Sequence, residues 1–447
     1  MALAGWSGAK LRMSQWLFGG PGWRSPQPGA KLRMSQWSGR KLAWVLAVLE
    51  IAAVLLVLVL KRFDGLDLEV YLGGAKALAQ QGSPYDAWVP TTHQILLPFT
   101  YTPFAAAVFL PGTLLPFAVT MKLVSIASIV ATGVVAYLYV ATLNGSLTDS
   151  SKIHGRAVAA LVAIVAQLAG ALLEPVRSTL GFGQINALLM LLVVLDVLLP
   201  GERARTKGLL IGVAAAIKLT PAVFVVYFLF RRDFKSAARV VVGFVAAGAL
   251  LWLVRPSASF TYWTKLVFDA GRIGGVDYVG NQSLRGLVTR IGLPEAAGNV
   301  VWLLAALAVM AVVAVVIVRA AEPVLGLTAC ALGGLLVSPI SWTHHWTWCV
   351  PILVLAGYYG VRAWRSDRVV TWWSGAVVVA GMALFIVGPM WFAPRPASSI
   401  GWWLATESYA LFGIALLVLA AFAARRLKAV NGTLRDSESL NVPFTAV

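Results

Sequence analysis

The sequence predicts an all-α polytopic membrane protein with about 10 to 12 membrane helices, some of them broken or re-entrant, and with interfacial helices on the outer side. Two observations predict this class. Hydrophobic residues make up 59% of the 447 residues and charged residues only 12%, and the mean hydropathy is +0.81. Apolar runs of about 17 to 25 residues, the length of a membrane-crossing helix, recur along the chain. Because unpaired backbone groups are costly in lipid, these runs must be helices rather than open sheet.

The formal net charge of +18 could indicate a nucleic-acid partner. The basic residues, however, lie in short clusters between apolar runs, which is the distribution that the positive-inside rule produces. We therefore expect no nucleic-acid partner. The two cysteines, Cys330 and Cys349, each lie inside an apolar segment, and we interpret them as small core residues rather than a disulfide.

Three regions are predicted along the chain. Residues 1–41 form a basic cytoplasmic arm, in which the nonapeptide from Gly8 to Trp16 recurs as Gly29 to Trp37. One duplicated segment is too few for a solenoid, so the arm either lies on anionic headgroups or reflects an accident of duplication. Residues 42–424 form a single membrane domain with outer loops at 61–102 and 255–299, and residues 425–447 form a cytoplasmic tail.

The first span is predicted from Leu42 to Leu60. Its basic flank places the preceding residues in the cytoplasm and Asp67 outside. The segment from Leu66 to Gln81 is amphipathic, which is typical of a helix lying in the membrane interface. Gly82 to Tyr85 ends this helix, and residues 86–102 are predicted to form an outer loop.

Two apolar segments are predicted to be broken. Basic clusters flank the segment from Gly208 to Phe230 on both sides, although it is long enough for only one crossing. Both of its ends should therefore face the cytoplasm, which a single crossing does not allow. A pair of half-helices broken near Pro221 would return the chain to the same side, and proline favours such a break because it lacks a helix N–H donor and disfavours helix just before it. The segment from Tyr101 to Ala118, with three prolines, is predicted to break in the same way. Broken helices at membrane depth line cavities, so the two segments predict a cavity.

The other predicted spans are Met121 to Leu143, Ala157 to Leu173, Ile185 to Leu199, Ala237 to Val254, Val300 to Val318, Val324 to Pro339, Trp346 to Tyr359, Val370 to Phe392 and Trp402 to Ala424. Each meets the length and apolarity of a membrane helix or approaches it.

An acidic cluster follows the first span directly. Asp64, Asp67 and Glu69 lie within six residues in a chain with only 18 acids. We interpret Asp67 as the general base of a membrane-embedded glycosyl transfer. The alternative is that these carboxylates are solvated residues that cap the next helix. For Asp64 and Glu69 this alternative and a functional role stand on equal terms.

Polar side chains are predicted to converge on the outer face of the membrane domain. An ionisable group within the membrane costs about 2.5 to 3.5 kcal/mol, so Lys218 at the predicted break is a candidate ligand for an anion such as phosphate. Its alternative is snorkelling to an interface. The other residues expected on this face are Asp67, His93, Arg177, Gln184, Asn186, Asn281, Gln282, His344 and His345.

The adjacent His344 and His345 lie between two predicted spans. A two-histidine metal site would need i, i+4 spacing and a third ligand, so we expect no metal there. A contact with phosphate or a hydroxyl is the functional interpretation, and a histidine packed among interfacial tryptophans is the alternative. No nucleotide-binding motif or soluble nucleotide-sugar domain is found, so a transferase of this kind would take its sugar from a lipid-linked donor.

Several stretches together resemble the bacterial GT-C glycosyltransferases that use polyprenyl-phosphate sugars, and among them the actinobacterial PimE-like α-1,2-mannosyltransferases. The stretches are Asp67 to Ala75 with Pro84-Tyr85, Tyr101-Thr102-Pro103, Gly183 to Asn186, Ala216 to Pro221, Asn281 to Leu284 and Ser338 to His345. The resemblance covers roughly residues 42–424.

The resemblance implies an inverting transfer of mannose from polyprenyl-phosphate-mannose to a phosphatidylinositol mannoside or related lipoglycan, without a cofactor or metal. It implies a multi-pass protein of the inner (plasma) membrane with an extracytoplasmic active site, and Asp67 as the catalytic base. The expected donor residues are Lys218, His344, His345, Arg177, Gln184 and Asn186. The expected acceptor residues are Glu69, Tyr71, His93, Asn281 and Gln282.

Two other functions remain open from the sequence. An arabinofuranosyltransferase of the same fold, using decaprenyl-phosphate-arabinose, would carry the same motifs. A lipid flippase or transporter would also have broken helices around a central cation, although such proteins typically contain inverted repeats, which this sequence lacks.

Overall fold

The computed structural model describes residues 28–60, 63–86, 88–149, 151–199, 205–395 and 397–440. It divides the chain into two units, Met1–Val48 and Leu49–Val447. The predicted basic arm, including its repeat, lies almost entirely outside the described side chains. The second unit contains the predicted membrane domain from Leu49 onward, and the account below concerns this unit.

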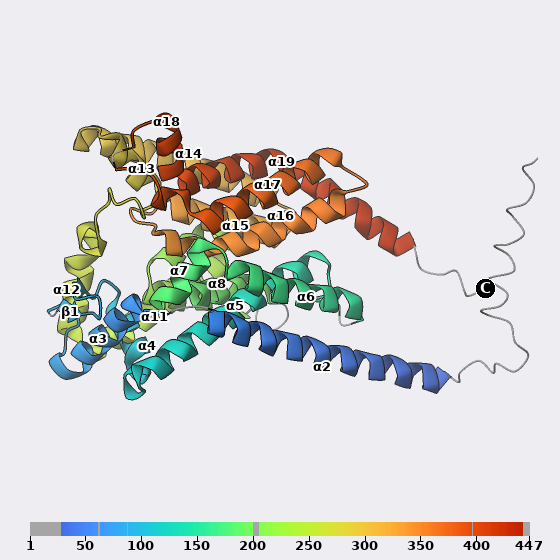
Figure 1. The fold of residues 1–447 in the computed structure, drawn as a ribbon, viewed down its shortest axis with the longest axis horizontal. Helices are drawn as coiled ribbons and strands as arrows, with labels where there is room; N and C mark the ends of the chain where they lie inside the picture. Colours follow the sequence, from blue (N-terminus) through green and yellow to red (C-terminus); the bar gives the residue numbers. More distant parts are fainter. Residues whose placement is uncertain are drawn as a thin grey trace, which may run out of the picture. The chain divides into compact units, whose positions relative to one another are not determined.

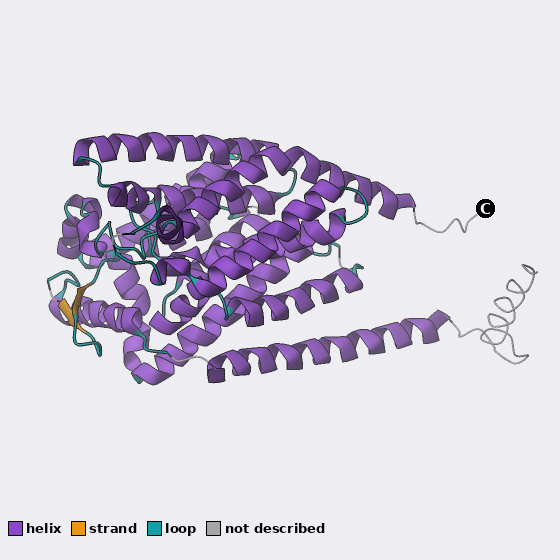
Figure 2. Cartoon of the chain, turned by 45° about the horizontal axis from the view of Figure 1, so that its top comes forward, coloured by secondary structure: helices purple, strands orange, loops and turns teal. Residues whose placement is uncertain are grey.

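Where the structure describes the second unit, its regular elements are helices and one small hairpin, in which β1 (Trp88–Pro90) pairs antiparallel with β2 (Leu96–Pro98) (Figure 2). The described α-helices that precede residue 200 are α2 (Pro28–Leu60), which begins in the first unit, α3 (Leu66–Gln81), α4 (Pro103–Phe109), α5 (Phe117–Leu143), α6 (Ile153–Gly170), α7 (Glu174–Phe182) and α8 (Asn186–Leu198). A 3-10 helix, η1 (Leu110–Leu114), joins α4 to α5.

The later α-helices are α9 (Leu209–Ile217), α10 (Val225–Phe230), α11 (Phe234–Val254), α12 (Pro256–Thr264), α13 (Leu284–Ile291), α14 (Glu295–Arg319), α15 (Pro323–Val337), α16 (Cys349–Ala363), α17 (Arg368–Val387), α18 (Ile400–Thr406) and α19 (Ser408–Leu440). The 3-10 helices in this part are η3 (Thr220–Phe224), η4 (Leu266–Phe268), η5 (Ala270–Ile273), η6 (Thr343–Trp348) and η7 (Pro389–Trp391).

Membrane-crossing helices confirm the predicted class. Within the described residues, 7 helices are long and apolar enough to cross a membrane, and the number rises to 8 if α7 and α8, bent by 112° at their junction, count as one span. The predicted number of 10 to 12 is not confirmed, because some predicted spans are short or interrupted helices. The predicted span at 324–339, for example, is the 15-residue α15.

Both predicted breaks are present. Helix α9 ends at Ile217, Lys218 adopts an extended conformation, and η3 begins at Thr220 with proline in its first turn. The segment after Tyr101 likewise divides into α4, η1 and α5. One further break was not predicted: the expected span from Trp402 to Ala424 is interrupted at Glu407, between α18 and α19.

Helix α9 is held against α11 by close backbone contact. A Cβ atom added at Gly212 would lie 2.4 Å from the carbonyl oxygen of Val240, and one added at Gly243 would lie 2.7 Å from that of Leu209. Glycine is required at both positions because small residues let two membrane helices approach closely. This packing fixes the end of α9, and therefore Lys218, relative to the bundle.

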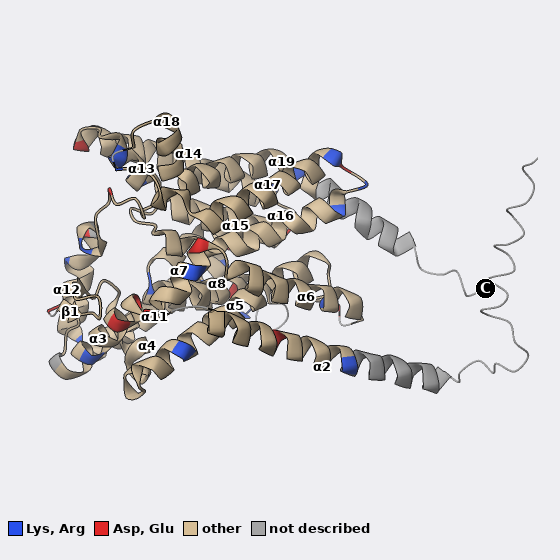
Figure 3. Cartoon of the chain, viewed as in Figure 1, with Lys and Arg blue, Asp and Glu red and all other residues tan. Residues whose placement is uncertain are grey.

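The two ends of the bundle differ. The short elements α3, α4, α12, α13, α18 and the hairpin gather at one end, on the left in Figure 1. At the opposite end, Lys and Arg residues lie where α16 joins α17, and others lie among the short elements (Figure 3). The short elements and broken helices thus build a distinct end of the molecule, and the candidate site lies there.

Candidate active site

A cavity of about 560 Å³ opens among the short elements and the broken helices. Its walls come from segments far apart in the sequence: α3, the hairpin, the Tyr101–Thr102 turn, the α7–α8 junction, the break after α9, η5 and the segment before η6. Among the residues singled out from the sequence, those lining it are Asp67, Tyr71, Gln184, Lys218, His344 and His345.

Asp67 lies in the first turn of α3, where backbone geometry fixes its position. Gly65 precedes the helix with φ 73°, a left-handed conformation that glycine adopts readily. The backbone N–H groups of Asp64 and Gly65 both donate to the carbonyl oxygen of Gly181, at 3.1 and 2.8 Å. The start of α3 is therefore tied to the end of α7, and Asp67 is held close to the α7–α8 junction.

Gln184 connects this junction to α3 and to the Tyr101 turn. Its Oε1 atom accepts hydrogen bonds from the hydroxyl of Tyr71 at 2.5 Å and from that of Tyr101 at 3.4 Å. The two tyrosine hydroxyls lie 2.7 Å apart. Because the amide oxygen accepts from these hydroxyls, the amide nitrogen of Gln184 is available to Asp67 and His344. It donates to the Asp67 carboxylate and lies 3.4 Å from the Nε2 atom of His344.

The surroundings of Asp67 change its acidity. Burial, which disfavours the charged carboxylate, raises the pKa of Asp67 from 3.8 to about 6, against the lowering effects of a hydrogen bond from Gln184 and the positive charge of Lys218. A carboxylate with a pKa near 6 is mostly ionised at neutral pH, yet it is a stronger base than an ordinary aspartate. These are the properties that a general base requires.

Lys218 extends from the break after α9 toward the opposite wall. Its Nζ atom donates to Asn186 Oδ1 at 3.0 Å and lies 3.0 Å from His345 Nε2. It also lies 5.4 Å from the centroid of the Tyr101 ring. An ammonium group has three N–H donors, so these two partners leave one for another acceptor. The nearby Thr102 hydroxyl donates to the carbonyl oxygen of Ala216, which joins α4 to the end of α9.

The two histidines lie at the start of η6. Because an ammonium group can only donate, the Nε2 atom of His345 accepts from Lys218, and the ring proton of neutral His345 is on Nδ1. The backbone oxygen of His344 accepts from the Thr179 hydroxyl at 2.7 Å and from Asn186 Nδ2 at 2.9 Å. Asn186 thus contacts both Lys218 and the histidine segment, although it does not line the cavity itself.

Asn281 and Gln282 are fully buried outside the cavity lining and bind backbone groups. Asn281 donates to the carbonyl oxygens of Val276 and Pro339, and its side-chain oxygen accepts from the Ser341 backbone N–H at 2.9 Å. Gln282 donates to the carbonyl oxygens of Val279 and Thr406. The Asn281 amide therefore joins the 276–282 loop to the segment that precedes His344, and the Gln282 amide joins the same loop to the junction of α18 and α19.

Three further expected site residues, besides Asn186, Asn281 and Gln282, lie away from the cavity lining. Arg177 is exposed, and its guanidinium donates to the backbone oxygen of Leu172. His93 is exposed and lies 3.8 Å from Asp64. Glu69 accepts from the backbone N–H of Thr92 at 2.9 Å, which joins α3 to the turn of the hairpin.

The cavity also contains residues that the sequence did not single out. Arg272 in η5 lines it and donates to the backbone oxygen of Phe99 at 3.2 Å. Trp88 and Trp342 add aromatic walls. Arg272 is one of five basic residues in the predicted outer loop 255–299, so nothing in the sequence distinguishes it. Only the fold brings it to the cavity.

A buried carboxylate, Glu174, holds the segment that contains the two histidines. Glu174, at the start of α7, is 3% exposed. Its Oε1 atom accepts from Ser178 at 2.8 Å and from Thr343 at 2.9 Å, and its Oε2 atom accepts from the Tyr409 hydroxyl at 3.0 Å. Since Thr343 directly precedes His344, Glu174 links α7 and α19 to the cavity wall. The sequence analysis did not identify it, because it lies inside a buried network.

Comparison with known proteins gives consistent matches. Residues 99–339 match glycosyltransferase family 87. Over 375 residues the chain is 36% identical to the polyprenol-phosphate-mannose-dependent alpha-(1-2)-phosphatidylinositol mannoside mannosyltransferase of Mycolicibacterium smegmatis, covering 79% of this chain and 83% of the relative. The corresponding pentamannoside mannosyltransferase of that organism is 36% identical over 347 residues, with 76% and 80% covered. A Mycobacterium tuberculosis mannoside mannosyltransferase is 32% identical over 420 residues, with 89% and 93% covered.

Proposed function

The chain belongs to glycosyltransferase family 87, and from this premise we propose that it transfers mannose from polyprenol-phosphate-mannose to a phosphatidylinositol mannoside, forming an α-1,2 bond. The names of the relatives supply the donor and acceptor. The single observation that carries the proposal is that Asp67 and Lys218 line one cavity close enough to interact electrostatically. A base and a cation facing one space are what transfer from a lipid phosphate needs.

In the proposed reaction, the Asp67 carboxylate accepts the proton of the attacking acceptor hydroxyl. A bond forms between that oxygen and C1 of the mannose, while the bond between C1 and the phosphate oxygen breaks. Attack opposite the leaving group inverts the anomeric centre. The polyprenyl phosphate leaves with the bonding electrons, and Lys218 stabilises the charge that develops on it.

The remaining contacts support an assignment of roles. Gln184 orients Asp67, and Asn186 orients Lys218. His344 and His345 face the donor sugar and phosphate from the opposite wall. Tyr71, which is fully buried on the Asp67 side, acts through its hydrogen bond to Gln184, whereas Asn281 and Gln282 act through the loop that they hold. Arg177, His93 and Glu69 lie at the periphery, where they would meet lipid headgroups or the distal part of the acceptor.

We place the site on the extracytoplasmic side of the inner membrane. The cavity lies at the end built by the short helices, and Arg362, Arg365 and Arg368 lie at the opposite end, where α16 joins α17 (Figure 3). The positive-inside rule assigns that basic end to the cytoplasm. The donor and acceptor would then reach the cavity from the outer leaflet.

The proposal is tested with the purified full-length protein in lipid vesicles. Radiolabelled polyprenyl-phosphate-mannose and decaprenyl-phosphate-arabinose are supplied separately with a phosphatidylinositol mannoside acceptor. We expect mannose transfer to a product that an α-1,2-mannosidase digests. Transfer of arabinose instead of mannose would show that the proposed donor is wrong.

The proposed role of Asp67 is tested in the same assay. Removing a general base costs about 10²- to 10⁴-fold in rate, so Asp67→Asn should lower the rate of mannose transfer by this factor. Asp64→Asn is the matched control, because Asp64 is exposed and lies outside the cavity lining. An Asp67→Asn protein that folds and transfers mannose at the normal rate would exclude the base role.

A further inference from the structure

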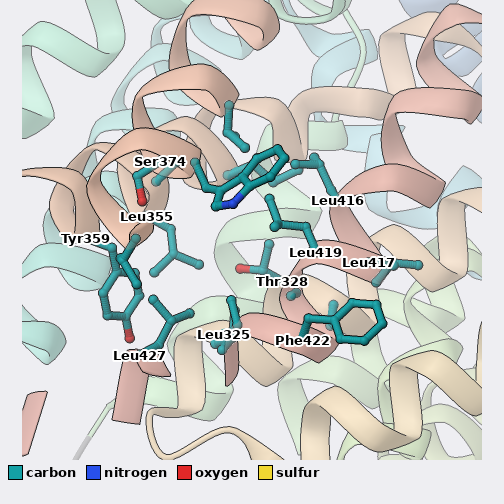
Figure 4. A pocket seen from close by; sticks show the side chains of 18 of the residues that line it. Leu325, Thr328, Leu355, Tyr359, Ser374, Leu416, Leu417, Leu419, Phe422 and Leu427 are labelled. Carbon is teal, nitrogen blue, oxygen red and sulfur yellow. The ribbon is translucent and has the colours of Figure 1, made fainter. Parts of the chain in front are cut away.

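A second cavity lies away from the site described above, between α15, α16, α17 and α19. Its volume is about 230 Å³. Figure 4 shows side chains of these helices around it, including Leu325, Leu355 and Leu416. No residue of the proposed active site contributes to its lining.

The lining is suited to hydrocarbon rather than water. Aliphatic and aromatic side chains make up most of it. The hydroxyl of Thr328, one of its few polar groups, already donates to the Val324 carbonyl oxygen at 2.7 Å and lies 3.0 Å from the Tyr139 hydroxyl. A buried water needs two to four polar partners, which this lining does not offer. An apolar ligand would instead gain dispersion contacts along the walls.

The cavity is long and open to the side. Its lining on α19 runs from Leu416 to Leu427, a distance of about 16 Å at the rise of an α-helix. Phe422 and Trp373 on its rim are 80% and 56% exposed. In a membrane protein these exposed faces contact lipid. The shape therefore matches one extended hydrocarbon chain entering from the bilayer.

One end of the cavity is positively charged. Arg426 lines it, is 58% exposed, and lies 3.7 Å from Asp367. The two segments that meet at this end, residues 362–368 and 425–426, contain five arginines and one aspartate. An anionic headgroup placed here would therefore meet a net positive charge, while its acyl chain occupied the apolar cavity.

From these observations we propose that the cavity binds one anionic phospholipid of the surrounding bilayer, with an acyl chain between α15, α16, α17 and α19 and the headgroup phosphate at Arg426. The site lies beside the basic end of the bundle and is separate from the mannosyl-transfer cavity. The inference rests on the membrane-spanning fold and does not depend on the proposed function.

Native mass spectrometry of the purified full-length protein tests this site. The protein is incubated with equimolar phosphatidylglycerol and phosphatidylcholine carrying identical acyl chains, and bound lipids are counted. We expect retention of one phosphatidylglycerol in preference to phosphatidylcholine. A basic residue near an anionic lipid contributes ~1 kcal/mol, so Arg426→Gln should reduce the preference about fivefold. Lys235→Gln, the same charge change at an exposed residue outside the cavity, should leave it unchanged.

Substitutions that fill the cavity test the binding of the acyl chain separately from the binding of the headgroup charge. Ala420→Phe should reduce the retention of both lipids, and Ala356→Leu on the opposite wall provides a second variant whose smaller side chain disturbs packing less. Thermal unfolding identifies which variants are folded. Equal binding of the two lipids by the wild type, an unchanged preference in Arg426→Gln, or full retention by a folded cavity-filling variant would overturn the proposal. The proposal would also be overturned if equimolar polyprenyl phosphate displaced phosphatidylglycerol, or if the protein were a dimer without bound lipid.

Discussion

Asp67 is the side chain whose ionisation the proposed reaction depends on, so its raised pKa sets the lower limit of the active pH range. The carboxylate is the active form, and its pKa of about 6 means that the active fraction falls as the pH falls below 6. We expect kcat/KM for mannose transfer to decrease about tenfold per pH unit below this value, since kcat/KM reports the ionisation of the free enzyme. An unperturbed aspartate would remain active down to about pH 4.

The measurement is a pH profile of kcat/KM between pH 4.5 and about 8, with thermal unfolding recorded at each pH to confirm that the protein stays folded. Gln184 lowers the pKa of Asp67 through a hydrogen bond, so Gln184→Leu should move the acid limb of the profile to higher pH. A wild-type profile that stays flat down to about pH 4.5, as expected for an unperturbed aspartate, would contradict the assigned environment of Asp67.

Lys218 provides the second residue-scale prediction. A hydrogen bond to a charged group contributes ~1.5 to 3 kcal/mol, so Lys218→Met should raise the KM for the polyprenyl-phosphate donor by about 10- to 100-fold. Lys76→Met, on the exposed face of α3, is the matched control. Should the substitution raise the KM for the acceptor and leave that for the donor unchanged, Lys218 would not be the phosphate ligand.

At the residue scale, the sequence indicated charged side chains that stand out from an apolar background. Lys218 was conspicuous beside Pro221, and Asp67 was conspicuous after a span; both line the cavity. Glu174 and Arg272 were not predicted. The importance of Glu174 lies in its contacts with Thr343 and Tyr409, which are 169 and 235 residues away in the sequence. Such contacts cannot be predicted from local pattern alone.

At the element scale, the junction of α7 and α8 connects the helix geometry to the catalytic proposal. Gly183 ends α7 with φ 70°, and a Cβ atom there would lie 2.8 Å from the Cβ of Leu68, the neighbour of Asp67. We expect Gly183→Ala to destabilise the fold by ~1 to 3 kcal/mol and to lower the transfer rate, because the added methyl group pushes α3 away from the junction.

Gly181→Ala is the control for this prediction. Gly181 lies within α7, and a Cβ atom added there would meet nothing within 4 Å. Alanine is also favoured over glycine in a helix. Thermal unfolding and mannose transfer are measured for both variants. Equal stability and equal rates in the two variants would show that the left-handed turn at Gly183 does not position Asp67.

Element boundaries were predictable where proline or glycine interrupts an apolar run. The break before Pro221 follows from the missing N–H of proline and from the restriction that it places on the preceding residue. The break at Glu407 has a different cause. Glu407 is fully buried and forms a salt bridge of 2.5 Å with Arg290 of α13. The sequence pattern across Trp402 to Ala424 is continuous, so this break becomes apparent only when the partner is known.

At the scale of the whole molecule, composition was sufficient to predict a polytopic membrane protein, and the family resemblance predicted the GT-C type. The number of spans was less predictable. Hydropathy detects apolar runs, but whether a short helix such as α15 crosses the membrane or packs inside the protein depends on its neighbours. Of its 15 residues, all but three are buried, which makes it a core helix of the bundle.

The orientation of the molecule is the last prediction. Thr92, in the hairpin turn beside the active-site end, and Ser366, in the turn between α16 and α17, are both exposed. The two native cysteines are buried and should not react. In intact cells, a membrane-impermeant thiol reagent should therefore label Thr92→Cys, and it should label Ser366→Cys only after the membrane is permeabilised. The reverse pattern would place Asp67 in the cytoplasm, where a polyprenyl-phosphate donor in the outer leaflet could not reach it, and the proposed reaction would have to be abandoned.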